Sequence, residues 1–169
     1  MATETKLRQL ADKGCPVYYF YSSERYLVRQ AVAAATRILT ADSDEDATVL
    51  DGAAPEIEQL IMAAGTISFF GTRRVVVLPE IDPAAYSDKD LEELNSTLSS
   101  LENAVVVLGS VFELERSKLK TGKRAQKLIA QCKALGYTEE LAKPKPFELK
   151  MMMIDRAKEQ GTSLPDGAA

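Results

Sequence analysis

The chain has 169 residues, of which 46% are hydrophobic and 27% charged, so it can bury the core of one ordinary domain and is not expected to be disordered. Its net charge is -4 and its pI about 5.0, which excludes the overall basic charge of many nucleic-acid-binding proteins. It contains no histidine, which excludes Ser-His and Cys-His catalysis and histidine metal sites.

The first unit is a strand followed by a helix. The β-branched and aromatic run VYYFYS, residues 17–22, predicts the strand. The helix is predicted over Glu24–Leu39, with Ser22 or Ser23 as its N-cap. Its apolar residues recur at helical spacing: Leu27, Val28, Ala31, Ala34, Ala35 and Ile38.

A second strand and helix follow. The strand is predicted over Ala47–Gly52, and Pro55 is suited to the first turn of the helix. The predicted core face of this helix consists of Ile57, Leu60, Ile61 and Ala64.

Two apolar strands surround the next helix. The segments RRVVVLPEI and NAVVVLGS have the continuous apolar centres of strands that are covered on both faces. Between them, Ser87 or Asp88 can cap a helix. The leucines of that helix are Leu91, Leu94, Leu98 and Leu101.

The last part of the chain begins with a basic segment. We expect a helix through KRAQKLIAQCKALG that ends at Gly136, a weak strand at YTEE, and a final helix over Phe147–Gln160. The two prolines of AKPKPF indicate a domain boundary there. The alternation of strands and helices predicts an α/β fold, with a mostly parallel sheet flanked by helices.

The distribution of charged, cysteine and apolar residues along the chain indicates the cellular compartment and the kinds of partner. Residues 1–110 carry 9 basic and 17 acidic side chains, whereas residues 111–150 carry 10 basic and 5 acidic ones. Cys15 and Cys132 lack metal-ligand spacing, which favours reduced thiols over a disulfide. No apolar run approaches the roughly 20 residues of a membrane span, and the polar start is not a signal peptide. These features predict a cytoplasmic protein without a membrane partner.

The expected ligand site of such a sheet contains no phosphate-binding loop. The turn after the first strand, FYSSERYLV, has neither the glycines nor the lysine that a P-loop needs. The third strand ends as VVVLPEID, and Pro79 stands where a P-loop ATPase places its magnesium-binding Asp. The pattern predicts an ATPase architecture without ATPase chemistry, cofactor or metal. A simple strand end is the alternative explanation of Pro79.

Two other groups of residues leave alternatives open. Strand-end carboxylates such as Asp51, Glu80 and Asp82 could serve a stand-alone α/β enzyme or a phospho-relay module. The basic segment LERSKLKTGKRAQK is either a solvated face or a set of phosphate contacts. Its candidate DNA contacts are Lys118, Lys120, Lys123, Arg124 and Lys127.

Taken in order, four stretches resemble the delta subunit of the bacterial DNA polymerase III clamp loader. They are VYYFYSSERYLVRQAV, DG…EIEQLIMAAGTISFFGTRRVVVLPEID, LENAVVVLG and KLIAQCKALGYTEE…PFELKMMMIDRAKEQG. The resemblance implies a P-loop-ATPase-like (AAA+) domain that does not hydrolyse nucleotide, over residues 1–143. It further implies that residues 144–169 begin a small helical lid domain, truncated here, and that the family's collar domain is missing.

The resemblance also implies a role and partners. In this family the first domain binds and opens the ring-shaped sliding clamp, the beta subunit. The matching positions here are Ile67, Ser68, Phe69 and Phe70, followed after a short turn by Arg73. The implied partners are the clamp, the ATPase and delta-prime-like subunits of the loader, and DNA within the assembled loader. The chain by itself would not be an enzyme, although it would belong to the DNA-directed DNA polymerase III complex.

The two adjacent phenylalanines have two possible environments. At about 100° per residue, Phe69 and Phe70 fall outside the predicted core face of their helix, so both rings face water if the helix continues to Gly71. Exposed paired aromatic rings are typical anchors for a hydrophobic pocket in a partner. If the helix instead ends near Gly65, the rings can fold back onto the core.

Overall fold

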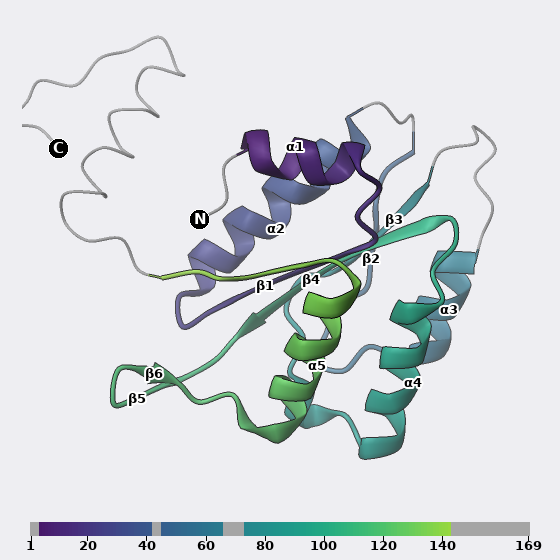
Figure 1. Cartoon of the computed structure of the whole chain (residues 1–169). Helices are drawn as coiled ribbons and strands as arrows, with labels where there is room; N and C mark the ends of the chain where they lie inside the picture. Colours follow the sequence, from purple (N-terminus) through teal and green to yellow (C-terminus); the bar gives the residue numbers. More distant parts are fainter. Residues whose placement is uncertain (1–3, 42–44, 66–72, 143–169) are drawn as a thin grey trace, which may run out of the picture.

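A computed structural model describes residues 4–41, 45–65 and 73–142, and within them the chain forms a three-layer α/β structure (Figure 1). Five parallel strands of this part form one sheet in the order β2-β3-β4-β1-β7, and two more form a small antiparallel hairpin, β5-β6. The strands are β1 Val17–Ser22, β2 Thr48–Val49, β3 Arg74–Leu78, β4 Ala104–Val111, β5 Leu114–Glu115, β6 Lys118–Leu119 and β7 Tyr137–Glu140.

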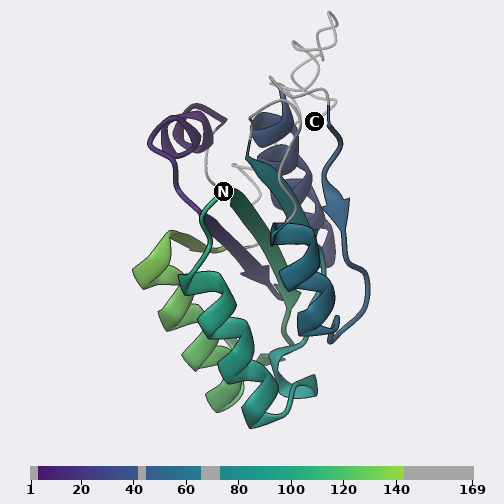
Figure 2. The same ribbon diagram turned by 90° about the vertical axis from the view of Figure 1, so that its right-hand side faces the viewer.

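Helices cover both faces of the sheet. Of the α-helices in the described residues, two lie on one face and three on the other, where α4 and α5 run side by side (Figure 2). The helices are α1 Glu4–Asp12, α2 Arg25–Thr40, α3 Ile57–Gly65, α4 Asp88–Ser99 and α5 Gly122–Leu135, and a short 3-10 helix, η1, covers Pro83–Ala85.

The parallel α/β sheet predicted from the alternation of strands and helices is confirmed. The two central strands β3 and β4 pair in register, with Val76 opposite Val106, and both of these valines are 0% exposed. Strands buried on both faces need apolar side chains at consecutive positions, because helices cover each face. The runs of valine in the sequence therefore mark the centre of the sheet.

Each face of the sheet has its own core. The α1 and α2 side contains Leu7, Leu27 and Val28, whereas the α3, α4 and α5 side contains Leu94, Leu128 and Cys132, among other residues. Both cysteines of the chain are free thiols. Burial raises the pKa of the Cys132 thiol to about 12, so this thiol stays protonated at neutral pH.

Two predictions about the second unit are corrected. The strand predicted over Ala47–Gly52 is reduced to Thr48–Val49, because only these two residues pair with β3 at the edge of the sheet. Ile61, predicted on the core face of α3, is 51% exposed. Neighbouring helical residues point about 100° apart, and Leu60 at 1% exposure already occupies the side that faces the sheet.

The helix caps differ in how well they were predicted. The Ser87 hydroxyl accepts a hydrogen bond from the Asp90 amide at 3.1 Å, as expected of an N-cap. The predicted serine cap of α2 is wrong: its N-cap is Glu24, which makes no side-chain cap bond. Ser22 is instead the buried last residue of β1, and its hydroxyl forms a hydrogen bond with Leu141 at the end of β7.

Several predicted features lie outside the described residues. They are the final helix over Phe147–Gln160, the boundary between residues 143 and 144, and the positions Ile67, Ser68, Phe69 and Phe70. The structure follows α3 as far as Gly65, so the two environments considered for the phenylalanines both stay predictions. Within the part of the chain that is described, no helix has the length and apolar character needed to span a membrane.

Candidate functional site

The carboxyl ends of β1 and β4 form the switch point of the sheet. After β1 the chain crosses through α2 toward the β2 edge, and after β4 it crosses through α5 to β7 at the other edge. Ligands of open α/β sheets bind where the connections diverge in this way. The residues at this place therefore decide whether the fold can hold a phosphate.

The turn after β1 is closed by the Ser22 hydroxyl. This side chain is 0% exposed, donates a hydrogen bond to the Leu141 carbonyl oxygen at 2.6 Å and accepts one from the Glu24 amide at 3.1 Å. The Ser22 carbonyl oxygen in turn accepts a hydrogen bond from the Phe112 amide at 2.8 Å. The turn is thus bonded to the ends of β4 and β7, and it holds neither glycine nor lysine for a phosphate.

The turn after β3 is bonded to β4 in a similar way. The Ile81 amide donates to the Gly109 carbonyl oxygen at 2.8 Å, and the Ser110 hydroxyl donates to the Ile81 carbonyl oxygen at 2.8 Å. Because that hydroxyl has a single hydrogen, the Tyr19 phenol must be the donor in its 2.6 Å bond to Ser110. Burial raises the pKa of Tyr19, which keeps this donor protonated.

The three strand-end carboxylates have different local contacts. Asp82 caps η1 by accepting a hydrogen bond from the Ala84 amide at 3.0 Å, and Glu80 forms an ion pair with Arg25. Asp51 is exposed in the loop after β2. Among the residues that the structure describes, no group of three or more acidic, Cys or His side chains is placed to hold a metal ion. The structure therefore does not bring these three carboxylates together as a metal site.

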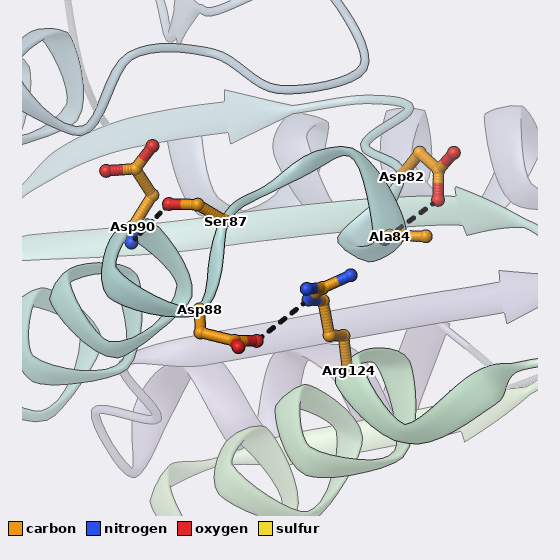
Figure 3. A network of polar contacts seen from close by, with 6 residues as sticks. All are labelled: Asp82, Ala84, Ser87, Asp88, Asp90 and Arg124. Carbon is orange, nitrogen blue, oxygen red and sulfur yellow. Dashed lines mark hydrogen bonds and ion pairs between the residues drawn. The ribbon is translucent and has the colours of Figure 1, made fainter.

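The basic segment covers the β5-β6 hairpin and the first turns of α5. All five of its candidate DNA contacts, Lys118, Lys120, Lys123, Arg124 and Lys127, are exposed. Arg124 donates to the Asp88 carboxylate at 3.0 Å, next to the caps of η1 and α4 (Figure 3). The Asp88 side chain is 85% exposed, so water screens this pair and it adds little stability. The hairpin also borders a pocket of about 550 Å³, which Lys118, Leu114 and Leu141 help to line.

Arg73, the one described member of the predicted clamp-binding set, braces two segments of backbone. Its guanidinium donates to the Gly14 carbonyl oxygen at 3.0 Å and to the Ala104 carbonyl oxygen at 3.3 Å. The first contact spans 59 positions of the chain, so no local pattern in the sequence could have revealed it. The side chain is half-buried, and a partner that binds it must use its remaining N–H donors.

The outer face of α3 carries an apolar surface that the helical pattern did not predict. Ile61 is 51% and Met62 73% exposed, and Ile61 borders a groove between the ends of α3 and α4. The signal in the sequence was the pair Ile61–Met62, since two adjacent apolar residues on a helix cannot both share the direction of Leu60.

One of the comparisons with known proteins finds a solved structure with a similar fold. Neither the known family models nor the curated proteins give a match to this sequence. The structure is similar to the crystal structure of a DNA polymerase III gamma subunit-related protein from Thermotoga maritima, with a TM-score of 0.60 and 15% sequence identity. The match covers 94% of this chain and 52% of the other, so the chain spans about half the length of that protein. The chain thus has an α/β fold like that of this gamma subunit-related protein, with a parallel sheet flanked by helices.

Proposed function

We propose that this chain is a non-catalytic clamp-loader subunit that binds the sliding clamp and helps to open its ring during DNA replication. The observation that carries the proposal is the segment ISFF, residues 67–70, which joins α3 to β3 in a fold like that of a DNA polymerase III gamma subunit-related protein. In the delta subunits that this sequence resembles, an aliphatic, a small and two large apolar residues at this place bind the clamp.

The binding energy in this proposal comes from burial of the apolar side chains Ile67, Phe69 and Phe70 in a pocket of the clamp. Aromatic anchors near the centre of an interface contribute more of the affinity than other contacts. ATP hydrolysis then belongs to partner subunits, of the ATPase and delta-prime-like kinds. A pull-down of the chain with the clamp of the same organism tests the proposal directly, since failure to bind would reject it.

The hydrogen bonds at the switch point support the proposal that this chain neither binds nor hydrolyses a nucleotide. The Ser22 hydroxyl is already bonded to Leu141 and to the Glu24 amide, and Pro79 occupies the expected place of a metal-binding Asp. A nucleotide at this place would have to displace these hydrogen bonds without gaining the backbone cradle of a P-loop.

We therefore predict no ATPase activity and no affinity for magnesium-ATP tighter than about millimolar. Isothermal calorimetry with the full chain checks this, and a melting curve with and without magnesium-ATP should show no shift, because only a bound ligand stabilises the folded state. Binding in the micromolar range would contradict the prediction and would favour the enzymatic alternative.

We further propose that the basic segment contacts DNA in the assembled loader. The double variant Lys123→Glu/Lys127→Glu should weaken DNA binding and leave clamp binding intact, because both side chains are exposed on α5. If each lysine contacts one phosphate, the slope of log affinity against log salt should fall by about 2.

The matched control for this variant is Lys13→Glu/Lys89→Glu, which changes the net charge equally at two exposed lysines outside the segment. It should leave the salt slope of DNA binding as it is. An equal slope in both double variants would show that Lys123 and Lys127 are solvated and contact no phosphate.

A further inference from the structure

A groove of about 370 Å³ lies between the carboxyl-terminal ends of α3 and α4. The apolar residues that line it include Ile61, Ala64 and Leu101, and the polar ones include Ser96, Ser100 and Asn103. Glu102 is the one charged side chain among the described residues that line it. The mixed lining therefore suits a segment that is partly apolar and can form hydrogen bonds.

The exposed face of α3 continues the apolar side of this groove. Ile57 and Leu60 are packed in the core and are only 6% and 1% exposed, whereas Ile61 and Met62 are 51% and 73% exposed. A surface helix usually has polar residues on the side that faces water. Large apolar side chains gathered on such a face are typical of a surface that binds another protein.

The groove lies beside both ends of the segment that contains the two phenylalanines. α3 ends at Gly65, which lines the groove, and the chain re-enters the described structure at Arg73. The amide of Arg74 then donates to the Asn103 carbonyl oxygen at 2.9 Å, and Asn103 also lines the groove. Phe69 is four residues from each end, so a partner that binds it comes within about 14 Å of the groove.

We propose that this groove is a second contact for the sliding clamp, next to the contact made by residues 67–70. The proposal rests on the proposed function, because that function identifies the partner brought to this place. An apolar side chain of the clamp would pack against Ile61 and Leu101. Backbone groups of the clamp next to that side chain would form hydrogen bonds with the hydroxyls of Ser96 and Ser100.

Two variants of the full chain, each with a matched control, test this contact. Ile61→Ser removes the exposed apolar side chain, and Ser96→Lys fills the groove with a long charged one. Their controls are Leu114→Ser, at an exposed leucine of the distant hairpin (Figure 1), and Ser99→Lys, at an exposed serine of α4 that does not line the groove. Clamp affinity and melting temperature are measured for all four.

We expect Ile61→Ser and Ser96→Lys each to weaken binding of the cognate clamp by about tenfold, with both controls within about twofold of wild type. Wild-type affinity in both groove variants, with binding lost in Phe70→Ala, would overturn the second contact and leave the proposed function standing. Wild-type affinity in Phe70→Ala as well would overturn the proposed function itself. A melting temperature of Ile61→Ser well below that of Leu114→Ser would show that Ile61 packs against other residues of the same chain. That result would also overturn the proposal.

Discussion

Phe69→Ala and Phe70→Ala are each expected to weaken binding of the sliding clamp by about 30- to 1000-fold. Truncation of an aromatic anchor at the centre of an interface removes roughly 2–4 kcal/mol of binding free energy. The melting temperature of the free chain should stay unchanged, because a ring that faces water contributes little to the core. Surface plasmon resonance and thermal unfolding of the same two variants measure both quantities.

The core alternative for these rings predicts the reverse result. If they pack beneath the turn, each substitution should lower the free energy of unfolding by about 3–5 kcal/mol and change clamp affinity only through unfolding. Phe112→Ala is the reference for that behaviour, because Phe112 is 7% exposed and its ring packs against Tyr21. Stable Phe69 and Phe70 variants with wild-type clamp affinity would reject the proposed contact.

Gly109→Ala is expected to lower the free energy of unfolding by about 3 kcal/mol. A Cβ atom at this position would lie 2.4 Å from the Pro79 carbonyl oxygen and 2.8 Å from Cγ1 of Val28. Both distances are shorter than ordinary van der Waals contacts, so the turn after β3 or the helix α2 must move. For a chain of this size the melting temperature should fall by about 6–12 °C.

Gly65→Ala is the matched control for this substitution. Apart from its chain neighbours and the backbone of its own helix, no atom of the described residues lies within 4 Å of the position that its Cβ would take. Alanine is also preferred to glycine in a helix by up to about 1 kcal/mol. Its melting temperature should therefore equal or slightly exceed that of wild type. A wild-type melting temperature for Gly109→Ala would mean that the Pro79 turn is not held against β4 as the structure describes.

Much of the sheet and of its helices could be predicted from local patterns. The apolar runs around Val76 and Val106 predict strands covered on both faces, and both are central strands. Leu91, Leu94 and Leu98 recur every three or four residues, and all three are buried beneath α4. These signals are strong because each depends only on which neighbouring positions are apolar.

Other elements carried no such signal. α1 buries one residue, Leu7, so it lacks the long apolar stripe that identifies a helix. The β5-β6 hairpin turns at Arg116 and Ser117, which have φ angles of 53° and 68°. Turns of this kind usually contain asparagine or glycine, because these residues adopt positive φ more easily. Arg and Ser at these positions therefore do not predict the turn.

At the candidate site, the sequence showed that the P-loop motif is missing, and the structure showed which hydrogen bonds the residues there make instead. The lack of glycines and lysine after β1 could be read directly, since a P-loop is a continuous local motif. The bond from Ser22 to Leu141 spans 119 positions, and that from Arg73 to Gly14 spans 59. Neither could be predicted, because such partners meet only after the strands have been ordered in the sheet.

The sequence by itself thus determined the order along the chain of the five sheet strands and of helices α2 to α5, the residues of the sheet centre and the segment proposed to bind the clamp. The tertiary structure decided that Ser22 joins strand ends instead of capping a helix, that Ile61 faces outward, and that the end of α3 borders a groove. The reason is physical: periodicity along a chain records which residues avoid water, whereas the partners of each side chain depend on how distant segments pack.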